Sequence, residues 1–241
     1  MKILRRNYEH RNLLLFLIFS MIYLQAIYSL SQGVSLLALT SAKSFFSNHS
    51  FIIVLLAITL YMVVNVKKHS DKMLLLCLTV MTAKNFIMLA SSFNKLILGL
   101  NFIYLVFAFY FFVTWELEIA KASYNPQFSE HDLEKDTRFP INGKMENLKT
   151  GEIFDVMVTN VDEESCFVLL TVESRDQFKA DAGATYRLTV SYENVLFVHN
   201  ARLASKYHRG LGLEFIQTPK SDFPLNWSDL HQVCLERGLF N

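Results

Sequence analysis

The chain has 241 residues, of which 52% are hydrophobic, a composition that excludes an ordinary soluble domain. A charged fraction of 19% equally excludes a protein made of membrane helices alone. The charges are divided, because Met1–Trp115 carries ten Lys/Arg and two Asp/Glu (+8), whereas Glu116–Asn241 carries thirteen and twenty (−7); we therefore expect a basic membrane half followed by an acidic soluble half.

Four apolar segments occupy the first half, each close to the ~20 residues that cross a bilayer as a helix. They are Leu13–Leu39, Phe51–Val66, Met73–Phe93 and Leu96–Trp115. The sequence therefore predicts four transmembrane helices, with the lipid bilayer as the first partner of the chain. A cleavable signal peptide is the alternative interpretation of the first segment, although its apolar run is too long for that role.

Basic residues gather before the first apolar segment and between the second and third, and the other two connections hold one lysine each. In chain order they are Lys2, Arg5, Arg6, Arg11, Lys43, Lys67, Lys68, Lys72 and Lys95. Since basic connections stay in the cytoplasm, the N-terminus and the second connection are predicted to be cytoplasmic. Four crossings then return the C-terminal half to the cytoplasm, which predicts a multi-pass protein of the cytoplasmic membrane.

The fourth helix is predicted to continue beyond the membrane. The stretch WELEIAKASYN keeps helix-forming residues to Tyr124, after which Asn125 and Pro126 break the pattern. These features predict a helical domain over 1–124, a linker over 125–137 and a second domain over 138–241.

The second domain changes to the period-two pattern of strands. Six short strands are expected at Phe139–Met145, Phe154–Val158, Phe167–Val172, Tyr186–Val190, Val195–Leu203 and Leu211–Phe215. Turn residues separate them, which predicts an all-β six-stranded antiparallel barrel. After Pro224, SDLHQVCLERG predicts a C-terminal helix that ends at Gly238.

No catalytic motif stands out, so we expect no enzyme activity, no catalytic residue, no metal and no cofactor. His199 falls within a strand pattern, and the acidic run Asp162–Glu164 is typical of a solvated hairpin turn. The three cysteines are scattered and have no metal-ligand spacing, which favours a reducing compartment. DNA and RNA are not expected as partners.

The order of features in the second half resembles the PilZ domain, a bacterial receptor module for cyclic di-GMP. The opening is Arg138 followed by FPI, a hairpin lies near Asn160, and the closing strand is YHRGLGLEFI, Tyr207–Ile216. The resemblance implies a PilZ-like barrel in a bacterial inner-membrane protein, with cyclic di-GMP as the ligand if the site is retained.

That family binds its ligand through an Arg-x-x-x-Arg pair and an Asp/Asn-x-Ser-x-x-Gly turn. Arg138 matches the second arginine, whereas Glu134 stands at the first with Lys135 beside it. In the turn, Asn160 matches, Asp162 replaces Ser and Ser165 replaces Gly. The ligand-binding residues implied by the resemblance are thus Arg138, Lys135, Asn160, Asp162 and Ser165. An acidic residue at a phosphate-facing position implies weak or lost nucleotide binding.

Three functions remain open on the sequence. The first is a membrane signalling or regulatory protein whose PilZ-like domain acts on an unidentified protein partner. The second is a working cyclic di-GMP receptor with a non-standard site. The third is a membrane subunit of an exopolysaccharide synthase or transport assembly. The sequence leaves open whether the chain forms homo-oligomers.

Overall fold

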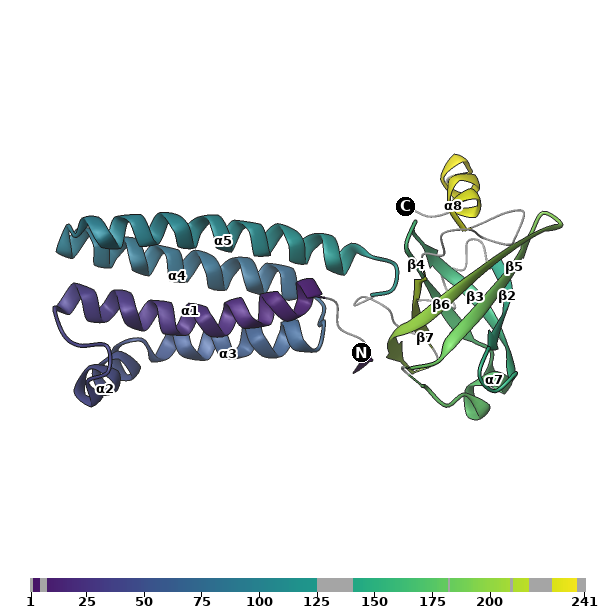
Figure 1. The fold of residues 1–241 in the computed structure, drawn as a ribbon, viewed down its shortest axis with the longest axis horizontal. Coiled ribbons are helices and arrows are strands. Elements are labelled where there is room, and N and C mark those ends of the chain that lie inside the picture. Colours follow the sequence, from purple (N-terminus) through teal and green to yellow (C-terminus); the bar gives the residue numbers. More distant parts are fainter. Residues whose placement is uncertain are drawn as a thin grey trace. The chain divides into compact units, whose positions relative to one another are not determined.

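The computed structural model describes residues 2–4, 8–124, 141–181, 183–208, 210–216 and 227–237. The chain divides into two compact units, of which one is Asn7–Glu118 and the other comprises Met1–Arg6 and Ile119–Asn241. The first unit is helical and the second is built around a β-barrel (Figure 1). Each is described by itself.

The helical unit contains five helices. They are α1 (Tyr8–Gln32), α2 (Leu39–Asn48), α3 (Ser50–Val64), α4 (Ser70–Ser92) and α5 (Lys95–Ala120), the last ending in the other unit. Three of them, α1, α4 and α5, are long and apolar enough to cross a membrane. Many of their large apolar side chains are exposed, which suits helices whose outer faces meet lipid.

The prediction of four full-length membrane spans is wrong in its count. The second apolar segment forms α3, whose 15 residues span only about 22 Å at about 1.5 Å per residue, against a hydrocarbon thickness of about 30 Å. The first predicted segment is also interrupted, because α1 ends at Gln32 and its remainder passes into α2. The predicted segments followed the apolar composition alone. In the structure, turns at Gly33 and His49 interrupt the helices and make them shorter than the apolar segments.

Ring contacts fix the direction of α5 against α1. Phe16 stacks on Phe111 at a centroid distance of 4.6 Å, and Tyr23 stacks on Tyr104 at 4.5 Å. The residue number rises along α1 while that of its partner falls along α5, so these two helices are antiparallel. The end of α1 at Tyr8 therefore lies at the same end of the helical unit as the last turns of α5.

A short chain of polar side chains crosses the interior of this unit. The Tyr23 hydroxyl donates to Asn101 Oδ1 at 2.7 Å, and Asn101 Nδ2 donates to the carbonyl of Asn85 at 3.3 Å. Tyr104, on the same helix as Asn101, donates to Ser20 Oγ at 3.2 Å. Hydrogen bonds of this kind join α1, α4 and α5 where polar groups cannot reach water.

The barrel has six antiparallel strands, as the period-two pattern predicted. They are β2 (Ile141–Asn147), β3 (Ile153–Val161), β4 (Ser165–Leu170), β5 (Thr185–Tyr192), β6 (Val195–Tyr207) and β7 (Gly210–Phe215). Their order is β6-β5-β2-β3-β4-β7, and pairing of β6 with β7 closes the barrel and removes its edges. Alternate side chains fill the interior, among them the fully buried Met145, Val158 and Leu188.

Three smaller elements complete this unit. The predicted C-terminal helix is present as α8 (Trp227–Glu236), and Gly238 lies outside the described residues. Two elements were not predicted: the short helix α7 (Val172–Gln177) and a two-residue strand β1 (Lys2–Ile3) that pairs with β6. The fourth membrane helix ends at Ala120 rather than at Tyr124.

Candidate functional site

The turn between β3 and β4 is organised by one carboxylate. Asp162 Oδ1 accepts the backbone amides of Glu164 at 2.8 Å and Ser165 at 2.6 Å. Asp162 Oδ2 accepts the hydroxyl of Ser165 at 2.6 Å. The amide of Asp162 in turn donates to the carbonyl of Ser165 at 2.9 Å. The backbone of the acidic turn is therefore held by Asp162, while Glu163 and Glu164 are exposed to solvent as expected for a hairpin turn.

The same carboxylate holds a segment from a distant part of the chain. This segment, Lys121–Tyr124, follows α5 directly and is called the tether below. The amide of Ala122 donates to Asp162 Oδ2 at 2.6 Å, and the amide of Ser123 donates to Ser165 Oγ at 3.0 Å. Ala122, Ser123 and Tyr124 are all buried. Two consecutive backbone donors of the tether are thus satisfied by the β3–β4 turn.

The carbonyl side of the tether is bound by the closing strands of the barrel. Ser205 Oγ, on β6, donates to the carbonyl oxygen of Ser123 at 2.6 Å. Gly212, on β7, pairs with Ser205 and leaves the space in which this carbonyl lies. A Cβ at Gly212 would overlap the Ser123 carbonyl oxygen and the Ser205 hydroxyl. Only glycine fits there without moving the tether, so this contact requires glycine at position 212.

The beginning of the chain reaches the barrel at the same serine. In the β1–β6 pairing Ile3 stands opposite Ser205, and the amide of Leu4 donates to the carbonyl of Ala204 at 2.9 Å. Residues that precede α1 and residues that follow α5 are therefore both bound around Ser205.

The C-terminal helix reinforces the turn from its other side. Trp227 Nε1 donates to the carbonyl of Asp162 at 3.1 Å, and the Trp227 ring packs on Phe215 at a centroid distance of 4.5 Å. Trp227 is only 1% exposed. The carbonyl and carboxylate of Asp162 therefore connect two parts of the chain, α8 and the tether, through one residue.

Titratable groups near this turn are shifted toward their neutral forms. Burial raises the pKa of the Cys166 thiol well above its usual value, and the nearby Asp162 carboxylate adds to the effect. Burial lowers the pKa of His199, opposed by the contact of its ring with the carbonyl of Ile216. Cys166 is inert as a nucleophile in this state, and His199 packs edge-on against Phe215 as a neutral ring.

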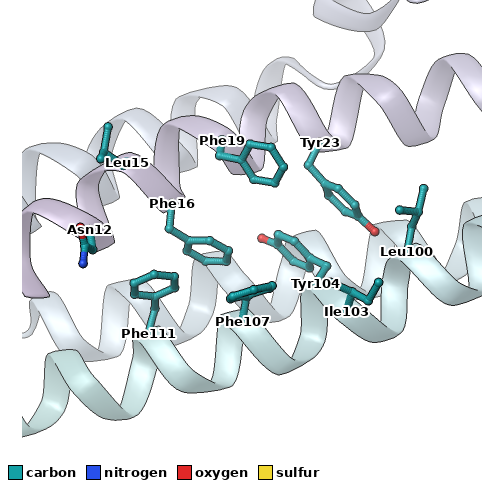
Figure 2. Close-up of a pocket in the computed structure, with 10 residues that line it drawn as sticks. All are labelled: Asn12, Leu15, Phe16, Phe19, Tyr23, Leu100, Ile103, Tyr104, Phe107 and Phe111. Atoms are coloured by element: carbon teal, nitrogen blue, oxygen red, sulfur yellow. The ribbon is translucent and has the colours of Figure 1, made fainter.

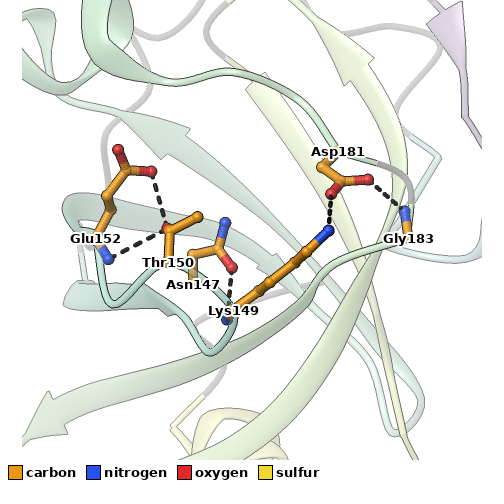
Figure 3. Close-up of polar contacts among 6 residues, drawn as sticks. All are labelled: Asn147, Lys149, Thr150, Glu152, Asp181 and Gly183. Atoms are coloured by element: carbon orange, nitrogen blue, oxygen red, sulfur yellow. Dashed lines mark hydrogen bonds and ion pairs between the residues drawn. The ribbon is translucent and has the colours of Figure 1, made fainter.

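A second polar cluster on the barrel contrasts with the tether site (Figure 3). Asp181 accepts the amide of Gly183 at 2.9 Å and pairs with Lys149 at 3.8 Å. Both side chains of that ion pair are exposed, at 75% for Lys149 and 49% for Asp181. Exposed pairs of this kind contribute little to stability. Nearby, Thr150 and Glu152 are hydrogen-bonded to each other, and the Glu152 carbonyl accepts the amide of Asn147 at 2.8 Å. These contacts close surface turns of the barrel.

The structure brings together two of the five residues implied as ligand contacts. Asp162 and Ser165 are hydrogen-bonded to each other and to the tether. Asn160 lies exposed at an irregularity in the β3–β4 pairing, two residues before Asp162. Lys135 and Arg138 lie outside the described residues, as does Glu134. Among the residues that are described, no group of three or more His, Cys, Asp or Glu could hold a metal ion.

The sequence reasoning missed Ala122, Ser123, Ser205 and Gly212. Ala122 and Ser123 bind the turn through backbone amides, so their side-chain types give no sign of the contact. Ser205 lies at a register shift of β6 and is buried. A polar residue at a buried strand position is the signal that could have identified it. Gly212 stands between Leu211 and Leu213 in the middle of β7, and a glycine inside a strand is a sign of close approach by another backbone.

No family model matches this sequence, and no curated protein matches it. Among solved structures, the chain is similar to the PilZ domain of CeSA from a cellulose-synthesizing bacterium. The two are 11% identical, with a TM-score of 0.31, over 42% of this chain and 93% of that one.

Proposed function

We propose that this chain is a bacterial inner-membrane regulatory protein whose PilZ-like barrel acts through protein contacts and has weak or no affinity for cyclic di-GMP. The observation that carries the proposal is that Asp162 already has hydrogen-bond partners within the chain. Its two oxygens accept four hydrogen bonds, three from the turn and one from the tether. A ligand approaching Asp162 and Ser165 has to displace the tether, at the cost of three hydrogen bonds made by the tether backbone.

The PilZ-like assignment rests on the order of sequence features together with the barrel. The hairpin turn after β3 lies at Asp162–Glu164, and the closing strand β7 carries Gly210 and Gly212 of the YHRGLGLEFI stretch. β7 pairs with β4 on one side and with β6 on the other. Six antiparallel strands closed in this way and followed by a helix are the architecture that the resemblance implies.

Helix direction supports the proposed membrane arrangement. Since α1 and α5 are antiparallel, the residues before α1 and after α5 emerge at one end of the helical unit, and the basic N-terminal residues favour the cytoplasm for that end. The chain must return once more between α1 and α4. We therefore propose that the short helix α3 completes that return in a locally thinned bilayer.

A signal in the membrane half reaches the barrel through the tether in this proposal. Two residues after α5 ends at Ala120, the backbone is already bound to Asp162. A rotation or axial shift of α5 therefore pulls directly on the β3–β4 turn and, through the Asp162 carbonyl, on Trp227 of α8. The surfaces of β4, β7 and α8 are where a protein partner would register that change.

Calorimetric titration of the full chain in detergent with cyclic di-GMP tests the proposal. We expect no saturable heat from the unaltered chain, and a new binding signal from Glu134→Arg, which restores the cation at the first arginine position. Glu163→Arg makes the same charge change on an exposed residue of the turn and is the matched control. Saturable binding by the unaltered chain that Arg138→Ala abolishes would contradict the proposal in favour of a nucleotide receptor.

A further inference from the structure

An apolar groove runs between α1 and α5 in the helical unit (Figure 2). Its volume is about 500 Å³, and aromatic rings from both helices line it, including Phe16, Phe19, Phe107 and Phe111. The side chains at its opening are half exposed, among them Leu15 at 59% and Ile103 at 53%. The groove is therefore open at the surface of the helical unit, on a face that meets hydrocarbon if the proposed membrane location holds.

The length of the groove matches one leaflet of a bilayer. It extends along α1 from Asn12 to Tyr23, eleven residues that rise about 16 Å, and one leaflet contributes about 15 Å of hydrocarbon. The Asn12 end lies near the start of α1, and the Tyr23 end lies where Tyr23 stacks on Tyr104. The groove thus begins at one membrane surface and ends near the bilayer centre.

The shape and lining of the groove suit an extended methylene chain. Its volume of about 500 Å³ is spread along about 16 Å of α1, and its lining is almost entirely apolar. Two tyrosine hydroxyls lie deeper along the groove, but those of Tyr23 and Tyr104 already donate to Asn101 and Ser20. A methylene chain lying along it keeps its apolar surroundings and leaves its polar head at the membrane surface.

Asn12 lines the surface end of the groove, and the Arg11 guanidinium stacks over the exposed Tyr8 ring at 4.9 Å. Tyr8 lies four residues before Asn12, on the same face of the helix. Glu9 lies on the opposite flank of that face by helical spacing. An amide and a guanidinium beside an apolar channel suit a phosphodiester with an attached chain.

We propose that this groove binds one acyl chain of a phospholipid from the leaflet at the Tyr8 end, with the phosphate at Arg11 and Asn12. The rings of Phe16 and Tyr23 already bridge α1 to α5, so a bound chain adds contacts to both helices, including the one that leads into the tether. The inference rests on the proposed membrane location of the chain.

Native mass spectrometry of the full chain, extracted in mild detergent and incubated with phosphatidylglycerol, tests this inference. We expect one retained lipid per chain, and a bound fraction reduced about tenfold or more by Ile103→Trp, which fills the groove. Leu105→Trp places the same ring on an exposed position that faces away on α5 and should retain the lipid. Arg11→Gln should weaken retention without abolishing it.

Each other outcome counts against a specific part of the account. Equal retention by Ile103→Trp and the Leu105→Trp control would overturn the groove as the binding site, as would no retention by the unaltered chain. Leu15→Trp fills the groove from the opposite wall, so it replaces Ile103→Trp if that variant does not fold. Recovery of the chain in the soluble fraction before extraction would instead overturn the membrane location itself.

Discussion

Replacing Asp162 with alanine is expected to lower the free energy of unfolding of the barrel unit by about 2–6 kcal/mol, because two buried amide donors lose their acceptor at about 1–3 kcal/mol each. Those donors belong to Ala122 and Ser165, whose residues are buried or nearly so. The amide of Glu164 is exposed and regains a bond to water. The loss therefore falls on the tether and on the start of β4.

Denaturant unfolding of the full chain measures this loss. A Trp115→Phe background leaves Trp227 as the only tryptophan, so its fluorescence reports the barrel unit. Asp181→Ala is the matched control, because that exposed carboxylate accepts one amide and one long ion pair, and we expect a change below about 1 kcal/mol. Equal effects of the two substitutions would show that Asp162 is an ordinary surface residue.

Gly212→Ala tests the tether contact without removing any hydrogen-bonding side chain. The added methyl group would occupy the place of the Ser123 carbonyl oxygen, so the tether has to leave the barrel. We expect protease cleavage near Lys121 to become faster while the barrel strands stay protected. Gly99→Ala, where a Cβ meets nothing within 4 Å, is the control and should leave cleavage unchanged.

Replacing Trp227 with alanine is expected to destabilise the packing of α8 on the barrel by about 3–5 kcal/mol, the usual range for a buried tryptophan. The indole is 1% exposed and packs on Phe215, so its removal leaves a cavity as well as an unpaired Asp162 carbonyl. Thermal unfolding followed by circular dichroism measures the effect.

Two variants separate the parts of this effect. Trp227→Phe keeps most of the ring and removes the bond from Nε1, so it should cost about 0.5–1.5 kcal/mol. Leu235→Ala, on the same helix but 57% exposed, is the control and should change stability by about 0.5 kcal/mol at most. A loss for Trp227→Ala no greater than for Leu235→Ala would contradict the assigned packing of α8.

The barrel was predictable because its signal is carried by side chains. Residues such as Phe154, Val156 and Val158 alternate with exposed neighbours, and that alternation marks a strand with one buried face. The C-terminal helix was predictable for the same kind of reason, since Trp227, Leu230 and Cys234 recur at helical spacing and are buried.

The tether and β1 were not predictable, because both act through the backbone. Ala122 and Ser123 bind Asp162 and Ser165 with amide groups that every residue type except proline possesses. β1 is two residues long, too short for any period to appear. The family resemblance directed attention to Asp162 and Ser165 as ligand contacts, and the structure gives both of them partners within the chain.

The length of α3 was misjudged for a different reason. Hydropathy reports that Phe51–Val66 is apolar, but it does not report where the backbone turns. His49 separates α2 from α3, and Asn65 ends α3 after 15 residues. Apolar composition therefore identified the segment as apolar but overestimated the length of its helix.

Amide hydrogen exchange of the tether in the full chain tests the central claim most directly. The account predicts that the amides of Ala122 and Ser123 exchange as slowly as those of β4, because each donates to a buried or nearly buried acceptor, and that Asp162→Ala speeds the exchange of Ala122 specifically. Exchange of both amides at the rate of an unprotected linker would contradict the claim that the barrel holds the tether at Asp162.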